Sequence, residues 1–266
     1  MKKIISLFAI LISIAPIFAQ NNTTGKTDVG LANKQNVVII PFENKMYISD
    51  IDKDLAQKNA MSYHEIKAKF RAALDQNIYI KLKPYYNPFS FYTIEQQDAA
   101  KELSYISNST GYKYTVIEQE EVVKKENIGS KFIGKFKKKE KEAEYIEAGV
   151  QNGQIVSQVD NRDKYMNTVV SNPNLIAKLN EKYNAKYYIF INQLDIKKGA
   201  DDMYAAAEEN YKREIKVHYT IIDQHGKEVS SGAIKTRFSS SQNDVDKIIK
   251  VHFPLIAETI VAKLIE

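Results

Sequence analysis

The sequence of 266 residues contains neither cysteine nor tryptophan. The absence of cysteine excludes disulfide bonds, thiolate metal sites, cysteine nucleophiles and iron–sulfur clusters. The folded protein must therefore be stabilised by its hydrophobic core alone. A chain of this length is large enough to build such a core.

The chain also lacks a large excess of charge of either sign. It has 38 Lys and Arg against 33 Asp and Glu, which gives a net charge of +5. Domains that bind nucleic acid carry a much stronger basic excess, usually gathered on one face. We therefore expect no nucleic-acid partner.

Signatures of the common enzyme classes are absent as well. The sequence has no Gly-x-Ser-x-Gly motif, no Walker loop and no Gly-x-Gly-x-x-Gly motif. The histidines are dispersed and lack the short helical spacing of a zinc site, so we expect them at the surface or as helix caps. They are His64, His218, His225 and His252. The sequence predicts no catalytic residue, no cofactor and no metal.

A calcium loop is the metal site that the sequence comes nearest to. Asp50, Asp52 and Asp54 have the spacing with which such a loop opens. However, Leu55 occupies the position where glycine makes the bend, and Met61 occupies the position of the bidentate glutamate. We therefore interpret the three aspartates as a solvated cluster that caps a helix.

The first residues have the three parts of a secretory signal peptide. Lys2 and Lys3 precede the apolar run from Ile4 to Ile14, and small residues precede a cleavage site after Ala19. We expect residues 1–19 to be removed and residues 20–35 to form a flexible leader. The mature chain is then periplasmic, without a transmembrane segment and without a cysteine to carry a lipid; an association with the outer membrane is left open.

The hydrophobic pattern of the remaining chain predicts alternating strands and helices. The strongest signals are a buried strand at Val37–Ile40, a helix that begins with a Ser62–Glu65 capping box, and a long strand at Lys186–Ile196. Weaker signals indicate a strand or the helix's continuation at Asn77–Lys83, a loop at 84–88, helices from Thr93 and Asn172, strands at 112–117 and 165–170, and an Asn-Gly hairpin at 151–154. A hairpin turning at 223–226 and a helix over 243–264, kinked or broken at Pro254, complete the chain.

This order favours one α/β domain over residues 36–266, with a mixed sheet, packed helices, and a long carboxyl-terminal antiparallel hairpin followed by a helix. The domain carries a charged insertion at about 119–143. The insertion sets apolar residues among lysines, and we predict a contact element for a partner there. Its candidate residues are Phe132, Phe136, Lys137, Lys138 and Lys139. The alternative is a charged, solvated loop.

Residues 37–44, VVIIPFEN, resemble the first strand of the superfamily that contains the TolB amino-terminal domain, the curli secretion protein CsgG and the penicillin-binding-protein activator LpoB. The helix at 173–184, the strand at 186–196 and the turn at 223–226 are similar in order. The resemblance implies a periplasmic adaptor fold without enzymatic activity. This chain differs by lacking the lipidated cysteine of CsgG and LpoB and by its insertion at 119–165.

These observations favour an exported binding or accessory protein of the cell envelope, whose partner is an envelope protein or a cell-wall component. The alternative is an envelope hydrolase that acts on glycan or peptide with two carboxylates that no motif marks. The two readings predict different surfaces. A binding protein should expose an apolar or aromatic patch, and an enzyme should hold convergent polar groups in a deep pocket. The oligomeric state is left open.

Overall fold

The computed structural model describes residues 34–117, 162–198 and 211–265, together with the backbone of four short strands between residues 145 and 160. The predicted signal peptide, all but the last two residues of the predicted leader, and the charged insertion at 119–143 lie outside the described residues. Within the described part, no helix is both long and apolar enough to span a membrane.

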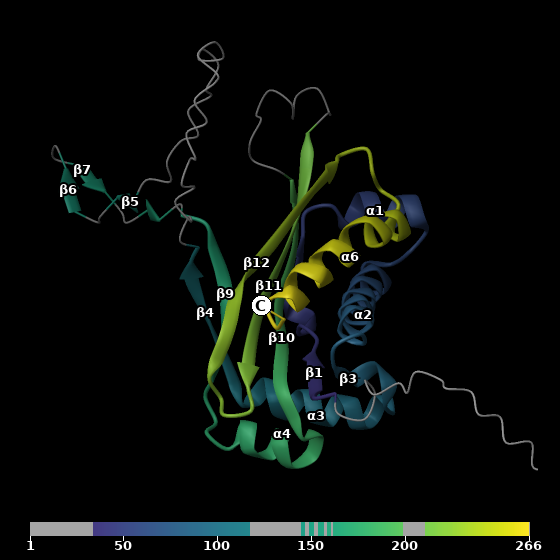
Figure 1. The fold of residues 1–266 in the computed structure, drawn as a ribbon. Helices are drawn as coiled ribbons and strands as arrows, with labels where there is room; N and C mark the ends of the chain where they lie inside the picture. Colours follow the sequence, from purple (N-terminus) through teal and green to yellow (C-terminus); the bar gives the residue numbers. More distant parts are fainter. Residues whose placement is uncertain are drawn as a thin grey trace, which may run out of the picture. The chain divides into compact units, whose positions relative to one another are not determined.

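A mixed sheet forms the centre of the domain, as the sequence predicts (Figure 1). Its strand order is β12-β11-β10-β1-β3, and β2 pairs with β10. Strand β1 runs parallel to both neighbours, whereas β10, β11 and β12 are antiparallel. The bounds are β1 (Asn36–Ile40), β2 (Tyr47–Ser49), β3 (Asn87–Ser90), β10 (Ala185–Lys198), β11 (Lys212–Asp223) and β12 (Glu228–Ser239).

Helices cover both faces of this sheet. On one face α1 (Asp52–Asn59), α2 (Tyr63–Leu82) and α6 (Val245–Ala262) bury the larger apolar core. On the other face α3 (Gln96–Asn108) and α4 (Leu175–Tyr183) enclose a smaller core. Strand β1 contributes Val37 and Ile39 to the first core and Val38 and Ile40 to the second, which is why its sequence is apolar without alternation.

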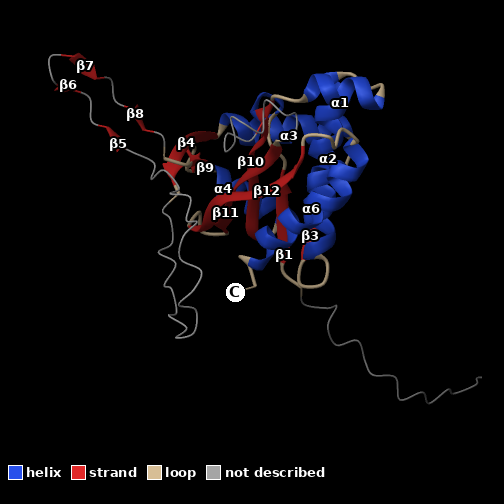
Figure 2. Ribbon diagram, turned by 90° about the horizontal axis from the view of Figure 1, so that it is seen from above, coloured by secondary structure: helices blue, strands red, loops and turns tan. Residues whose placement is uncertain are grey.

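A two-stranded ribbon lies on the second face beside α3 and α4. It consists of β4 (Thr110–Val116) and β9 (Lys164–Val170), and Figures 1 and 2 both show it opposite α2 and α6. Two further strand pairs are β5 (Tyr145–Ile146) with β8 (Val159–Asp160), and β6 (Gly149–Gln151) with β7 (Gln154–Val156). The pairing of Gln151 with Gln154 confirms the predicted Asn-Gly hairpin.

Local sequence signals correctly predicted the start of α2 and the turn between β11 and β12. Ser62 and Glu65 form the predicted capping box of α2, with reciprocal hydrogen bonds between side chains and backbone. At the β11–β12 turn the Asp223 carboxylate accepts hydrogen bonds from two backbone N–H groups, and Gly226 adopts a φ of 80°. That left-handed conformation is readily available to glycine.

Four local predictions need correction. The segment 84–88 is not only a loop, because Asn87 begins strand β3; Pro88 is tolerated there since β3 is the edge strand. Helix α3 begins at Gln96 instead of Thr93, whose hydroxyl donates to the carbonyl of Ser90 in a preceding 3₁₀ turn. Helix α4 begins at Leu175, with Asn174 as its N-cap, instead of being capped by Asn172. Of the kink or break predicted at Pro254, the break is absent from α6, because the buried residues Phe253 and Ile256 keep the helix packed on the first core.

Candidate functional site

A cavity opens at the carboxyl ends of the parallel strands β1 and β3. The connection from β1 to β3 runs through α2 on one face, and the connection from β3 to β10 includes α3 and α4 on the other. The strand ends therefore open between α2 and α3, which is where open α/β sheets bind ligands. The cavity has a volume of about 550 Å³. It is lined by Pro41, Asn44, Arg71, Phe91, Tyr92, Ile94, Gln96, Ala99, Ala100 and Leu103.

Arg71 is the one charged residue among those that line this cavity. Its Nε donates to the carbonyl of Phe42 at 2.6 Å, and its Nη1 donates to the hydroxyl of Tyr92 at 3.1 Å. The guanidinium carbon also lies 5.7 Å from the centre of the Tyr92 ring. A guanidinium has more N–H donors than these two acceptors use. Arg71 is thus held by one backbone and one aromatic contact, and no described carboxylate lies within ion-pair distance of it.

A second, smaller cavity of about 40 Å³ lies against the first and shares Pro41, Arg71 and Leu103 with it. Its wall includes Glu43, whose carboxylate accepts a hydrogen bond from the Tyr112 hydroxyl at 3.0 Å. Burial acts to raise the pKa of Glu43, but hydrogen bonds from Ser107, Lys45 and Tyr112 outweigh it and lower the pKa. Glu43 is therefore an ionised carboxylate that its own neighbours already satisfy.

Asp75 lies one helical turn after Arg71 on α2 and is only 3% exposed. Its Oδ1 accepts a short hydrogen bond from the Ser90 hydroxyl, and its Oδ2 has no hydrogen-bond partner in the described structure. Burial raises the pKa of Asp75 to about 7, against the opposing effects of Ser90 and Arg71. Asp75 lines neither cavity, so its carboxyl group supports the wall without reaching the space inside.

A second group of polar side chains is buried where the ribbon meets the sheet. Asn192 lies at a bulge in β10, and its amide donates to the Met166 carbonyl at 2.7 Å and accepts from the Thr168 hydroxyl at 2.6 Å. The backbone N–H of Met166 donates to His218 at 2.7 Å, and that of Thr168 donates to the Thr220 hydroxyl at 3.0 Å. Side chains of the sheet thus provide hydrogen-bond partners for the backbone N–H and C=O groups of β9, which need such partners once they are buried.

His218 continues this network towards Asp195. Because its Nδ1 accepts from the Met166 backbone, the neutral ring carries its proton on Nε2, which lies 3.3 Å from an oxygen of Asp195. Burial lowers the pKa of His218, although Asp195 acts to raise it. Burial acts to raise the pKa of Asp195, but hydrogen bonds from His218 and Gln193 lower it. The network is buried and internally satisfied, so it joins the ribbon to the sheet and leaves no group directed at a ligand.

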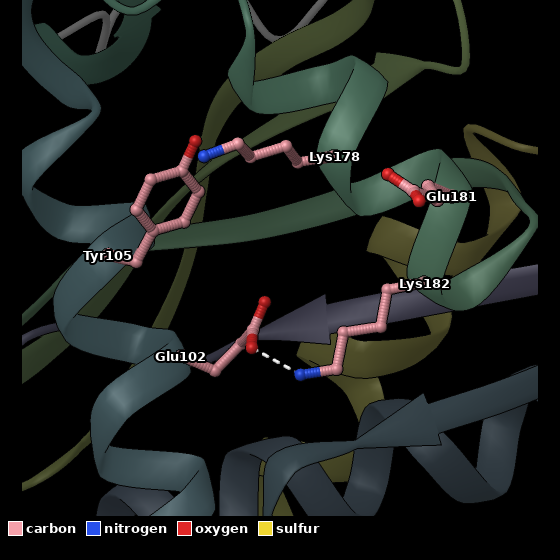
Figure 3. Close-up of a pocket in the computed structure, with 5 residues that line it drawn as sticks. All are labelled: Glu102, Tyr105, Lys178, Glu181 and Lys182. Carbon is pink, nitrogen blue, oxygen red and sulfur yellow. Dashed lines mark hydrogen bonds and ion pairs between the residues drawn. The ribbon is translucent and has the colours of Figure 1, made fainter.

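A depression of about 500 Å³ between α3 and α4 is the third hollow of interest (Figure 3). Glu102 and Tyr105 come from α3, and Lys178, Glu181 and Lys182 come from α4. Glu102 forms a close ion pair with Lys182, and the Lys178 ammonium lies 4.8 Å from the centre of the Tyr105 ring. Its two acidic and two basic residues balance one another, so this depression offers no net charge to a ligand.

The structure does not gather the aspartates of the candidate calcium loop. Asp52 accepts a hydrogen bond from the Tyr47 hydroxyl at 2.6 Å, and Asp54 forms an ion pair with the buried Arg213 at 2.7 Å. Across the described ranges, no three His, Asp or Glu residues lie close enough to hold a metal ion. The prediction that the histidines lie at the surface was wrong for His218 and His252, which are 1% and 8% exposed.

The predicted contact residues Phe132, Phe136 and Lys137–Lys139 lie outside the described residues, and their role stays a prediction. Sequence patterns did not point to Arg71 or Tyr92. Arg71 lies in an amphipathic helix where charged residues normally face solvent, and Tyr92 lies in a short connection. Only the fold brings them together at one edge of the sheet.

The fold and the site define a mixed α/β protein. At the carboxyl ends of its parallel strands it has a cavity that is lined by one positively charged residue. No known family matches the sequence, and no curated protein matches it. Among solved structures, the chain resembles the crystal structure of lipoprotein GNA1162 from Neisseria meningitidis at 9% identity and a TM-score of 0.34. That alignment covers 86% of this chain and 97% of the other. Likeness at this level defines no relationship, so the resemblance to the TolB, CsgG and LpoB superfamily stays a prediction.

Proposed function

We propose that this chain is an exported, non-catalytic binding protein of the cell envelope, and that its ligand occupies the Arg71 cavity. The observation that carries the proposal is the composition of that cavity. Its wall holds one cation among apolar, aromatic and neutral polar residues at the sheet edge where α/β proteins bind ligands. The export signal in the sequence supports the envelope location.

The alternative, an envelope hydrolase, requires an acid and a base that touch the substrate. No Asp, Glu or His is among the residues that line the Arg71 cavity in the described structure. Asp75 has a raised pKa of about 7, as a general acid often does, but it is buried and does not line the cavity. Glu43 faces a space of about 40 Å³, which holds little more than one water molecule. These positions favour binding over hydrolysis.

Native mass spectrometry of the protein isolated from the envelope fraction tests the proposal. Ala100 is an exposed alanine of α3 that lines the cavity, and Ala68 is an exposed alanine of α2 that does not. An Ala100→Trp variant should fill the cavity, and an Ala68→Trp variant is the matched control. Wild type and Ala68→Trp should retain a non-covalently bound small molecule that Ala100→Trp has lost. A bare wild-type chain, or a bound molecule that persists in Ala100→Trp, contradicts the proposal.

A further inference from the structure

We infer that the Arg71 cavity takes a small molecule that carries one carboxylate on an apolar body. This inference rests on the proposed function and names the chemical class of its ligand. It follows from three properties of the cavity: the number of its charges, the composition of its wall and its volume.

Among the residues that line the cavity, the only charge is one guanidinium. Arg71 is fixed by the Phe42 carbonyl and the Tyr92 hydroxyl, and both contacts leave it positively charged. Its remaining N–H donors favour a planar acceptor such as a carboxylate, because a guanidinium and a carboxylate can form two parallel hydrogen bonds. A doubly charged phosphate is normally held by more than one cation or by a glycine-rich loop. The lining residues provide neither, so the site suits a single negative charge.

The rest of the wall is suited to an apolar body. Phe91 is buried, and its ring packs against Phe89 at 5.4 Å, so this part of the wall is rigid. Pro41, Ile94 and Leu103 add aliphatic surface, and neutral Asn44 and Gln96 complete the rim. An ion with no apolar part would leave this surface exposed to water, so acetate should bind more weakly than a longer carboxylate.

The volume of about 550 Å³ sets the size of the ligand. It lies within the range of roughly 300–1,000 Å³ that is usual for small-molecule sites. The cavity therefore suits a compact molecule, such as a medium-chain fatty acid or the last residue of an apolar peptide. These two sources share the same chemistry, a carboxylate next to an apolar group, and the experiment distinguishes them.

Isothermal titration with four probes tests the inference. Octanoate has both the carboxylate and the apolar body, octanol lacks the charge, and acetate lacks the body. N-acetyl-leucine represents a peptide carboxyl terminus. We expect octanoate or N-acetyl-leucine to bind at least about tenfold more tightly than octanol, which cannot form the charge-assisted hydrogen bond, and at least about tenfold more tightly than acetate, which buries no apolar body. The tighter of the two identifies the source.

Substitutions at the site assign the binding to Arg71. Arg71→Gln should weaken carboxylate binding by about tenfold or more while leaving octanol unchanged. Arg71→Lys keeps the charge without the planar fork and should recover only part of the affinity. Because Arg71 also supports the Phe42 carbonyl, Tyr92→Phe provides a milder test: it removes one partner of the guanidinium and retains the ring. The affinity of the Tyr92→Phe variant for the carboxylate probes should differ from that of the wild type, while its melting temperature stays the same.

Three results overturn the inference. They are equal binding of octanoate and octanol, carboxylate affinity that survives in Arg71→Gln, and the absence of binding by every carboxylate probe. If the probes fail while native mass spectrometry still finds a small molecule that Ala100→Trp loses, the chemical class is wrong and the proposed function stands. If the wild type also carries no such molecule, the chemical class and the proposed function are both wrong.

Discussion

Replacing Asp75 with asparagine should change how the stability of the protein depends on pH. Asp75 is buried with one oxygen unpartnered, and burial raises its pKa from 3.8 to about 7. A raised folded-state pKa means that the folded protein holds a proton that the unfolded chain releases. The stabilising effect of the neutral group is therefore complete below pH 3.8 and is lost as the pH rises through 7.

The size of the effect follows from the shift in pKa. Each pKa unit corresponds to about 1.4 kcal/mol, so ionisation of Asp75 lowers the free energy of unfolding by about 4 kcal/mol between pH 4 and pH 8. Asparagine has nearly the same shape, still accepts the hydrogen bond from Ser90 and does not ionise. The Asp75→Asn variant should therefore gain about 4 kcal/mol relative to the wild type over this range.

Urea denaturation followed by circular dichroism, at unit steps from pH 4 to pH 8, measures this difference. Asp98→Asn is the control, because Asp98 is also in a helix but its side chain is 68% exposed. The control should follow the wild type at every pH. A constant difference between Asp75→Asn and the wild type from pH 4 to pH 8 would refute the argument that Asp75 is neutral in the folded protein.

Three other predictions concern the sheet, the ribbon and the insertion. Because burial lowers the pKa of His218 below 6.5, the melting temperature of the wild type relative to a His218→Gln variant should fall as the pH falls below 6.5. Ile39→Asp or Ile189→Asp should each prevent soluble folding, since an unpaired charge in the core costs several kcal/mol; a normal melting curve would contradict this. Deletion of residues 124–142 should leave the melting temperature unchanged and abolish capture of an envelope partner, and capture by the deleted form would show that the segment is not the contact.

Long apolar runs and capping residues made most of the fold predictable. Strands β1 and β10 are buried on both faces along most or all of their length, and each contains a continuous apolar run, Val37–Ile40 in β1 and Tyr187–Ile191 in β10. Helix α2 could be recognised from Ser62 and Glu65, because the capping box is a local signal. Strand β3 was missed because it is short and contains Pro88, and its pairing depends on β1, which is distant in the sequence.

The candidate site could not be predicted, because its parts are distant in sequence and ordinary in type. Strand β11 alternates between apolar and polar residues, which usually indicates a face in water. The polar face instead carries His218 and Thr220 beneath β9. In the same way, Arg71 and Tyr92 belong to segments with no motif, and only the fold, with α2 on one face and α3 on the other at the ends of β1 and β3, places them around a cavity.

A crystal structure of the protein with octanoate tests the central claim most directly. The account predicts that the carboxylate lies within hydrogen-bond distance of the Arg71 guanidinium, with the alkyl chain against Phe91 and Leu103 between α2 and α3. Octanoate bound instead in the depression between α3 and α4, or oriented with its carboxylate away from Arg71, would contradict it.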